Sequence, residues 1–119
     1  MPEIKLGEIE SRFADLIWTN EPLHSRELAK MAEAALGWKP STSYTILKRL
    51  CDRGLFQNVK QTVTSLISKE EFYSIQSEKF VENTFEGSLP AFLAAFSKRK
   101  KYSEEEVERM KQILDSMRG

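Results

Sequence analysis

Apolar residues recur at helical spacing in the first half of the chain and predict three helices. Residues 7–19 place Ile9, Phe13, Leu16 and Ile17 at i, i+4, i+7 and i+8, the pattern of a helix with one buried face. A second helix is predicted from Ser25 to Gly37, and a third from Ser41 to Arg53, where Ser41 is the N-cap and Gly54 ends the helix. The link between the second and third helices is short, as in a helix-turn-helix.

The spacing of apolar residues changes after Gly54. Residues 55–67 are rich in apolar and β-branched side chains and contain no helix cap, which predicts a two-stranded hairpin that turns near Asn58 to Gln61. Three helices followed by a hairpin is the order of a winged helix. In such a domain the third helix enters the major groove of DNA, and we expect the hairpin to lie along the phosphate backbone.

The last part of the chain returns to helical spacing, and each of its helices begins at a serine. Ser68 with Glu71 forms a capping box before a helix that runs to about Phe85. Ser88 caps a short apolar helix, and Ser103 caps the last one. The predicted fold class is therefore mainly α with a small β-hairpin, with a winged helix-turn-helix domain at 1–67 and a helical dimerisation domain at 68–119.

The third helix has two different faces. Ser43, Ile46, Leu47 and Leu50 fall on one side, and a polar set that includes Thr45 and Lys48 recurs on the other. Hydroxyl and cationic groups donate hydrogen bonds to phosphates and base edges, so this pattern indicates a recognition helix. An ordinary amphipathic helix with a solvated polar face is the alternative. The predicted DNA contacts are Lys39, Ser41, Thr42, Tyr44, Thr45, Lys48, Arg49 and, on the hairpin, Lys60.

The C-terminal helices carry more apolar side chains than they can bury alone, so they either fold back on the first domain or pair with a second chain. We favour a homodimer, because two linked recognition helices bind DNA more tightly than one helix that makes few base contacts. The predicted dimer residues are Phe72, Ile75, Phe80, Phe92, Phe96, Val107, Met110, Leu114 and Met117.

Composition limits the alternatives. The net charge of zero argues against a polybasic nucleic-acid binder, although basic residues outnumber acids between Lys39 and Lys60. With one cysteine, Cys51, and one histidine, His24, the chain offers no disulfide framework, metal cluster or Ser-His relay, so we expect no enzyme, cofactor or metal. His24 is expected at the surface or in a cap. No signal peptide or long apolar run is present, so we expect a cytoplasmic protein without a membrane partner.

Three segments of the sequence resemble one family. The run W-x-P-S-T-x-Y-T-x-L-x-R-L-x-x-x-G at Trp38 to Gly54, the opening LGEIESRFADLIW and the SKEEF after the hairpin are similar to the penicillinase-repressor family, BlaI/MecI/CopY. The resemblance implies a dimeric winged-helix transcriptional repressor whose C-terminal helices form the dimer. It also implies that Thr42, Thr45 and Arg49 contact DNA, because they match the recognition helix of the family.

The resemblance also bears on how repression ends. In antibiotic-responsive members a protease pathway, signalled by a membrane β-lactam sensor, cuts an Asn-Phe bond. The corresponding bond here is Ala95-Phe96, without the Asn. Copper-responsive members have a C-terminal cysteine-metal motif, but no cysteine follows Cys51. We therefore expect a sequence-specific homodimeric repressor on a pseudo-palindromic operator, with a signalling protease as a further candidate partner; a winged helix used as a protein-interaction module is the alternative.

Overall fold

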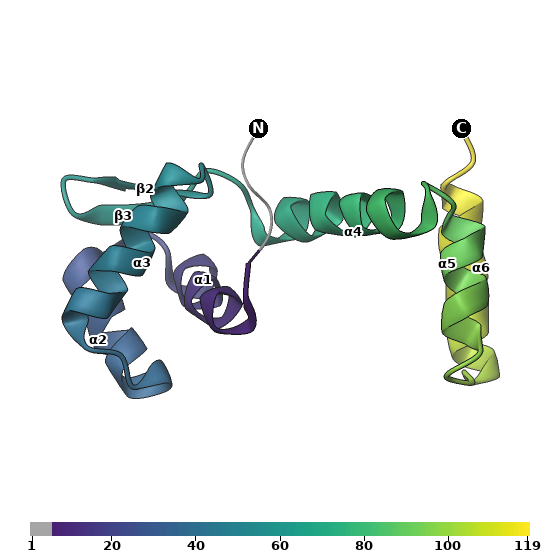
Figure 1. The fold of residues 1–119 in the computed structure, drawn as a ribbon, viewed down its shortest axis with the longest axis horizontal. Coiled ribbons are helices and arrows are strands. Elements are labelled where there is room, and N and C mark those ends of the chain that lie inside the picture. Colours follow the sequence, from purple (N-terminus) through teal and green to yellow (C-terminus); the bar gives the residue numbers. More distant parts are fainter. Residues whose placement is uncertain (1–5) are drawn as a thin grey trace. The chain divides into compact units, whose positions relative to one another are not determined.

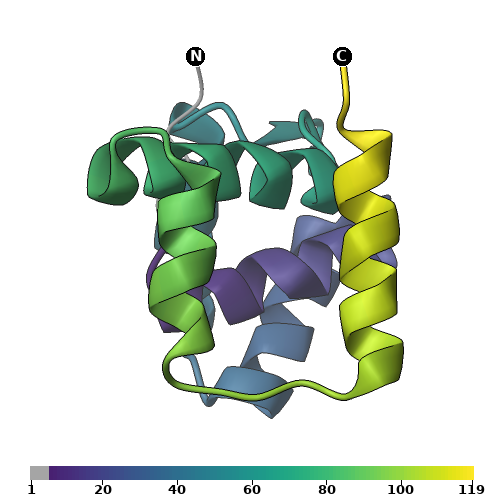
Figure 2. The same cartoon turned by 90° about the vertical axis from the view of Figure 1, so that its right-hand side faces the viewer.

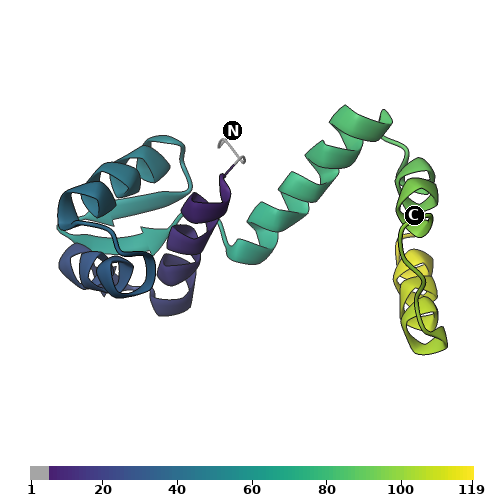
Figure 3. The ribbon, with the colours of Figure 1, turned by 60° about the horizontal axis from the view of Figure 1, so that its bottom comes forward.

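A computed structural model describes residues 6–119 and divides the chain into two compact units, one that extends to Glu78 and one from Lys79 to Gly119. Figure 1 labels the elements, and Figures 1 and 3 show the helices and hairpin of the first unit from two directions. The predicted fold class, mainly α with a small antiparallel sheet, is confirmed.

The three predicted N-terminal helices are present as α1 (Glu8–Asn20), α2 (Ser25–Leu36) and α3 (Pro40–Asp52). The helix α2 ends where Gly37 adopts a φ of 71°, a left-handed conformation that glycine takes without strain. The helix α3 begins earlier than predicted, because its N-cap is Lys39, two residues before the predicted N-cap Ser41. Proline is favoured in the first turn because its fixed φ suits the helix and its missing N–H would have no helical partner there.

The hairpin consists of β2 (Phe56–Val59) and β3 (Thr62–Ser65), which pair antiparallel with Val59 opposite Thr62. The two residues between them, Lys60 and Gln61, both have positive φ, at 51° and 70°, as a tight two-residue hairpin turn requires. A further strand that the sequence did not predict, β1 (Leu23–His24), pairs with the other edge of β3 and gives the sheet order β1-β3-β2.

The core of the first unit lies between its helices and the sheet. Phe13 of α1, Leu50 of α3 and Phe56 of β2 are completely buried in it. The indole N–H of Trp18 donates a hydrogen bond to the Ile67 carbonyl at 3.0 Å, which ties α1 to the segment after the hairpin.

The helix α4 (Lys69–Phe85) begins at the predicted Ser68 cap, whose hydroxyl accepts a hydrogen bond from the Glu71 N–H at 3.0 Å. Its first turns belong to the first unit. Phe72 is completely buried there and packs on Trp18, and Ile75 packs against the same core. The predicted dimer contact of Phe72 is therefore corrected, because the core of its own chain already covers this ring completely. Ile75 is only half-buried, so its dimer contact stays a prediction.

The second unit contains the end of α4 together with α5 (Leu89–Ser97) and α6 (Glu104–Ser116). Ser88 and Ser103 cap α5 and α6 as predicted, each accepting a hydrogen bond from a backbone N–H three residues later. Figure 2 shows α5 and α6 side by side and antiparallel. Neither helix has a fully buried residue, so their apolar faces remain open to solvent within one chain.

Candidate nucleic-acid interface

The helix α3 presents one apolar and one polar face, as its sequence predicts. Ser43, Leu47 and Leu50 are buried. The predicted contact residues of this helix are all exposed, and they are Ser41, Thr42, Tyr44, Thr45, Lys48 and Arg49. Lys39 is exposed immediately before the helix. The structure thus brings together a surface of hydroxyl, phenol and cationic groups, which we call the α3 polar face.

One hydroxyl of the α3 polar face is already engaged. The Thr45 Oγ1 donates a hydrogen bond to the Ser41 carbonyl at 2.9 Å, the usual bond of a threonine to the preceding helical turn. In this rotamer Thr45 offers a partner its methyl group and the lone pairs of its oxygen, rather than a donor. Its predicted role therefore narrows to contact with an apolar group, such as the methyl of thymine, or with a base amino group.

The cations of α3 have acidic partners. The Lys48 Nζ lies 3.2 Å from Asp52 Oδ2 one turn further along, and both side chains are largely exposed. The Glu10 Oε2, from α1, lies 3.9 Å from an Arg49 Nη1 and 3.5 Å from an Arg53 Nη1. A DNA phosphate that approaches this end of the helix would have to exchange with these carboxylates.

The hairpin tip is hydrogen-bonded to the start of α2. The Ser25 N–H donates to the Gln61 carbonyl at 2.8 Å, and the His24 Nε2 lies 2.8 Å from Gln61 Oε1. The His24 Nδ1 accepts a hydrogen bond from the Arg26 N–H, so Nε2 carries the proton and donates to Gln61. His24 is thus the N-cap of α2, in agreement with its predicted capping role. These bonds fix the backbone of the turn that carries the exposed Lys60.

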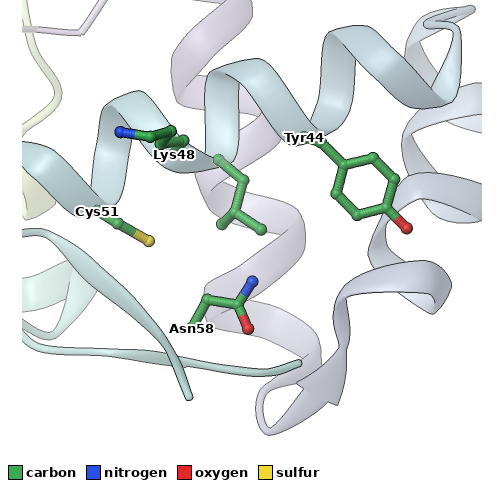
Figure 4. A pocket seen from close by; sticks show the side chains of 5 residues that line it. Tyr44, Lys48, Cys51 and Asn58 are labelled. Carbon is green, nitrogen blue, oxygen red and sulfur yellow. The ribbon is translucent and has the colours of Figure 1, made fainter. Parts of the chain in front are cut away.

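A hollow of about 290 Å³ lies between α3 and the hairpin, lined by Tyr44, Leu47, Lys48, Cys51 and Asn58 (Figure 4). Burial raises the pKa of the Cys51 thiol, nearby Asp52 raises it further, and Lys48 lowers it. Asn58 of β2 was missed as a functional candidate, because the sequence placed it in the turn of the hairpin. Its exposed amide adds a donor and an acceptor beside the α3 polar face.

The remaining predicted dimer residues lie in the second unit. Phe80, Phe96, Val107, Leu114 and Met117 are strongly exposed, and Phe92 and Met110 are half-buried. The rings of Phe80, Phe92 and Phe96 belong to a continuous aromatic series that also includes Phe85 and Tyr102. Leu89 and Leu93 of α5 face Val107 and Leu114 of α6 across an apolar groove of about 330 Å³.

Within residues 6–119, no group of three His, Cys, Asp or Glu side chains is placed to hold a metal ion. None of the helices in this part of the chain has the length and apolarity needed to cross a bilayer.

Comparison with known proteins relates the chain to one family. The family model described as "Penicillinase repressor" matches residues 6–116. The penicillinase repressor of Bacillus licheniformis is 25% identical over 119 residues, which covers 97% of this chain and 91% of the relative. The methicillin resistance regulatory protein MecI of Staphylococcus aureus (strain Mu50 / ATCC 700699) is 20% identical over 115 residues, with 93% and 94% covered.

Among solved structures, the solution structure of the DNA binding domain of the repressor BlaI matches with a TM-score of 0.54. It is 24% identical, and the match covers 60% of this chain and 93% of that domain. At this level of identity the match establishes the fold, and it supports the winged-helix arrangement predicted from the order of helices and hairpin.

Proposed function

Because this chain belongs to the penicillinase repressor family, we propose that it represses transcription by binding an operator DNA as a homodimer. The match of the family model confirms the resemblance seen in the sequence. Since the family consists of repressors, the chain is a regulator and not an enzyme. The observation that carries the proposal is the α3 polar face, which combines exposed donors, acceptors and cations on a helix of a winged-helix fold.

The proposed mechanism follows from the chemistry of the α3 polar face. Thr42, Tyr44 and Thr45 contact base edges in the major groove, and Arg49 forms a two-pronged hydrogen bond with a guanine. Lys39 and Lys48 neutralise phosphates. Lys60 reaches the backbone from the hairpin tip, where it is the only charged residue of residues 55–67. Occupancy of a promoter by the protein, in the cytoplasm with the DNA, then excludes the polymerase.

The exposed apolar faces of α5 and α6 support the homodimer. Phe96, Leu114 and Met117 each keep more than 40% of their surface open to solvent in a single chain, which is costly unless a second surface covers them. A two-fold dimer buries the same face of both chains and presents two recognition helices to a pseudo-palindromic site. We therefore assign dimer contacts to Ile75, Phe80, Phe92, Phe96, Val107, Met110, Leu114 and Met117, and leave Phe72 in the core of the first unit.

We extend the proposal to release of repression by cleavage of the Ala95–Phe96 bond. Both residues are exposed, but they lie inside α5, so a protease that binds extended backbone needs this helix to open first. A β-lactam-type signal would act through that protease. Mass spectrometry of the chain recovered from its host before and after β-lactam treatment tests this step, and a chain that stays intact while repression ends would exclude it.

The DNA-binding proposal is tested by fluorescence anisotropy with DNA selected by the protein from a random library, and with the DNA upstream of its own gene. Thr45→Ala is expected to weaken binding to the selected sequence more than to shuffled DNA, because the methyl contact is lost only on the correct base. Lys48→Ala is expected to weaken both and to lower the slope of log K against log salt by about 1.

If neither substitution changes the affinity, the α3 polar face is not the contact surface. A protein that selects no sequence at all would favour the alternative, a winged helix that binds another protein. The net charge of zero and the acidic partners of Lys48 and Arg49 are the observations that keep this alternative in view.

A further inference from the structure

A single carboxylate from α1 reaches the far end of α3. The Glu10 side chain keeps only 21% of its surface exposed, and its Oε2 lies 3.5 Å from Arg53 and 3.9 Å from Arg49. Its other oxygen, Oε1, accepts a hydrogen bond from the Gly7 N–H at 3.3 Å and so closes the capping box of α1. Glu10 therefore joins the start of α1 to the cationic end of the proposed recognition helix.

The ion pair of Lys48 differs in kind from the ion pairs that Glu10 makes with Arg49 and Arg53. Lys48 and Asp52 lie one turn apart on the same helix, with 78% and 67% of their side chains exposed. Their ion pair is therefore weak and leaves both side chains mobile. The Glu10 carboxylate is instead fixed by its own helix cap and comes from a different element. A fixed acceptor restricts which way a long arginine can point, and it does so before any DNA arrives.

Arg49 is suited to this kind of guidance. Its side chain is 52% exposed, and one guanidinium nitrogen lies 3.9 Å from the Glu10 Oε2, within the distance of an ion pair but too far for a hydrogen bond, which Glu10 accepts from Arg53 instead. An arginine that is already oriented loses less side-chain entropy when it forms a two-pronged hydrogen bond with a guanine.

We propose that Glu10 is a positioning residue for DNA recognition, which orients Arg49 on the α3 polar face and thereby raises discrimination between operator and other DNA. This inference rests on the proposed function. It differs from a simple electrostatic effect, because an acid near DNA only repels phosphates and would weaken binding to every sequence by the same factor. Positioning changes the ratio between sequences.

The test compares Glu10→Gln with Glu8→Gln in the full chain. Both substitutions remove one negative charge from the first turn of α1, and glutamine at position 10 keeps the acceptor of the capping box. No ion pair within residues 6–119 involves Glu8, which makes it the matched control for charge. The measured quantity is the ratio of Kd for shuffled DNA to Kd for the sequence that the wild-type protein selects.

We expect Glu10→Gln to lower this ratio about threefold, while Glu8→Gln changes it by less than about twofold. In an Arg49→Ala background, Glu10→Gln should have no further effect on the ratio, because the residue that it orients is gone. In the free protein, the NMR signal of the Arg49 Nε–H should be distinct in the wild type and should move to the position of a freely rotating arginine in Glu10→Gln.

The outcomes separate the two levels of the argument. A wild-type protein that selects no sequence overturns the proposed function and this inference with it. A wild-type protein that selects a sequence, combined with an equal ratio in Glu10→Gln and Glu8→Gln, overturns the positioning role alone. A ratio that falls in Glu10→Gln even when Arg49 is already alanine would also overturn it, because Glu10 would then act through another group.

Discussion

Replacing Phe72 with alanine separates the core of the first unit from the dimer surface. Phe72 is completely buried among Trp18, Tyr73 and the other core side chains, so Phe72→Ala removes a ring that the surrounding helices cannot replace. Substitutions of this type cost about 3–5 kcal/mol of unfolding free energy. Domains of this size have a total stability of about 0.05–0.15 kcal/mol per residue, so the loss is a large fraction of the whole.

The two tryptophans of the chain, Trp18 and Trp38, make this measurable. Both lie in the first unit, where Trp18 packs on Phe72 and Trp38 packs on Phe13 at a ring distance of 5.0 Å. Their fluorescence during urea unfolding therefore reports that unit. With a slope of about 1–3 kcal/mol per molar urea, we expect the midpoint of Phe72→Ala to fall by about 1 M or more.

Phe96→Ala is the contrasting variant. Phe96 is 45% exposed in the second unit, so its loss should leave the tryptophan transition of the monomer unchanged and weaken dimerisation, measured by sedimentation equilibrium. If Phe72→Ala instead weakens the dimer while the tryptophan transition stays in place, Phe72 is an interface residue and not part of the core.

The remaining predictions concern a helix cap, a thiol and the apolar groove. His24→Ala should lower stability by about 1 kcal/mol in the same urea assay, since the Arg26 N–H loses its acceptor, whereas His24→Asn should retain most of it. Because burial and Asp52 raise the pKa of Cys51, iodoacetamide should alkylate the native thiol more slowly than the urea-unfolded one near neutral pH. Equal alkylation rates in the native and unfolded states would contradict the raised pKa. Because the folded pKa of the thiol is the higher one, its contribution to the unfolding free energy is fully present below the unfolded pKa and is lost as the pH rises through the folded pKa. Leu114→Asp should abolish the dimer in sedimentation, and a dimer that persists would place the interface elsewhere.

Local signals account for most of what the sequence predicted. The serines at 68, 88 and 103 each begin a helix, because a cap depends only on residues a few positions away. The apolar and polar faces of α3 were also predicted correctly, because the helical spacing of neighbouring residues determines which side chains share a face. The N-cap of α3 differed by two residues, because Pro40 and Ser41 are both acceptable in a first turn and the pattern does not decide between them.

Contacts between distant segments account for what the sequence missed. The strand β1 contains only Leu23 and His24, too few residues for a pattern, and it exists because β3 offers it an edge. Apolar spacing marked Phe72 as buried but did not say against which partner. The ion pair between Glu10 and Arg49 joins positions 39 residues apart, and no local sequence rule connects them.

The turn of the hairpin has a consequence for any attempt to stabilise this protein. Lys60 and Gln61 occupy left-handed backbone conformations that Asn-Gly would adopt with less strain. Installing Asn-Gly should therefore make the hairpin fold more readily, yet it would delete the one cationic side chain on that loop and the amide that His24 holds. A more thermostable variant made this way should bind a polyanion more weakly. At these two positions, changes that raise thermal stability therefore lower the affinity for a polyanion.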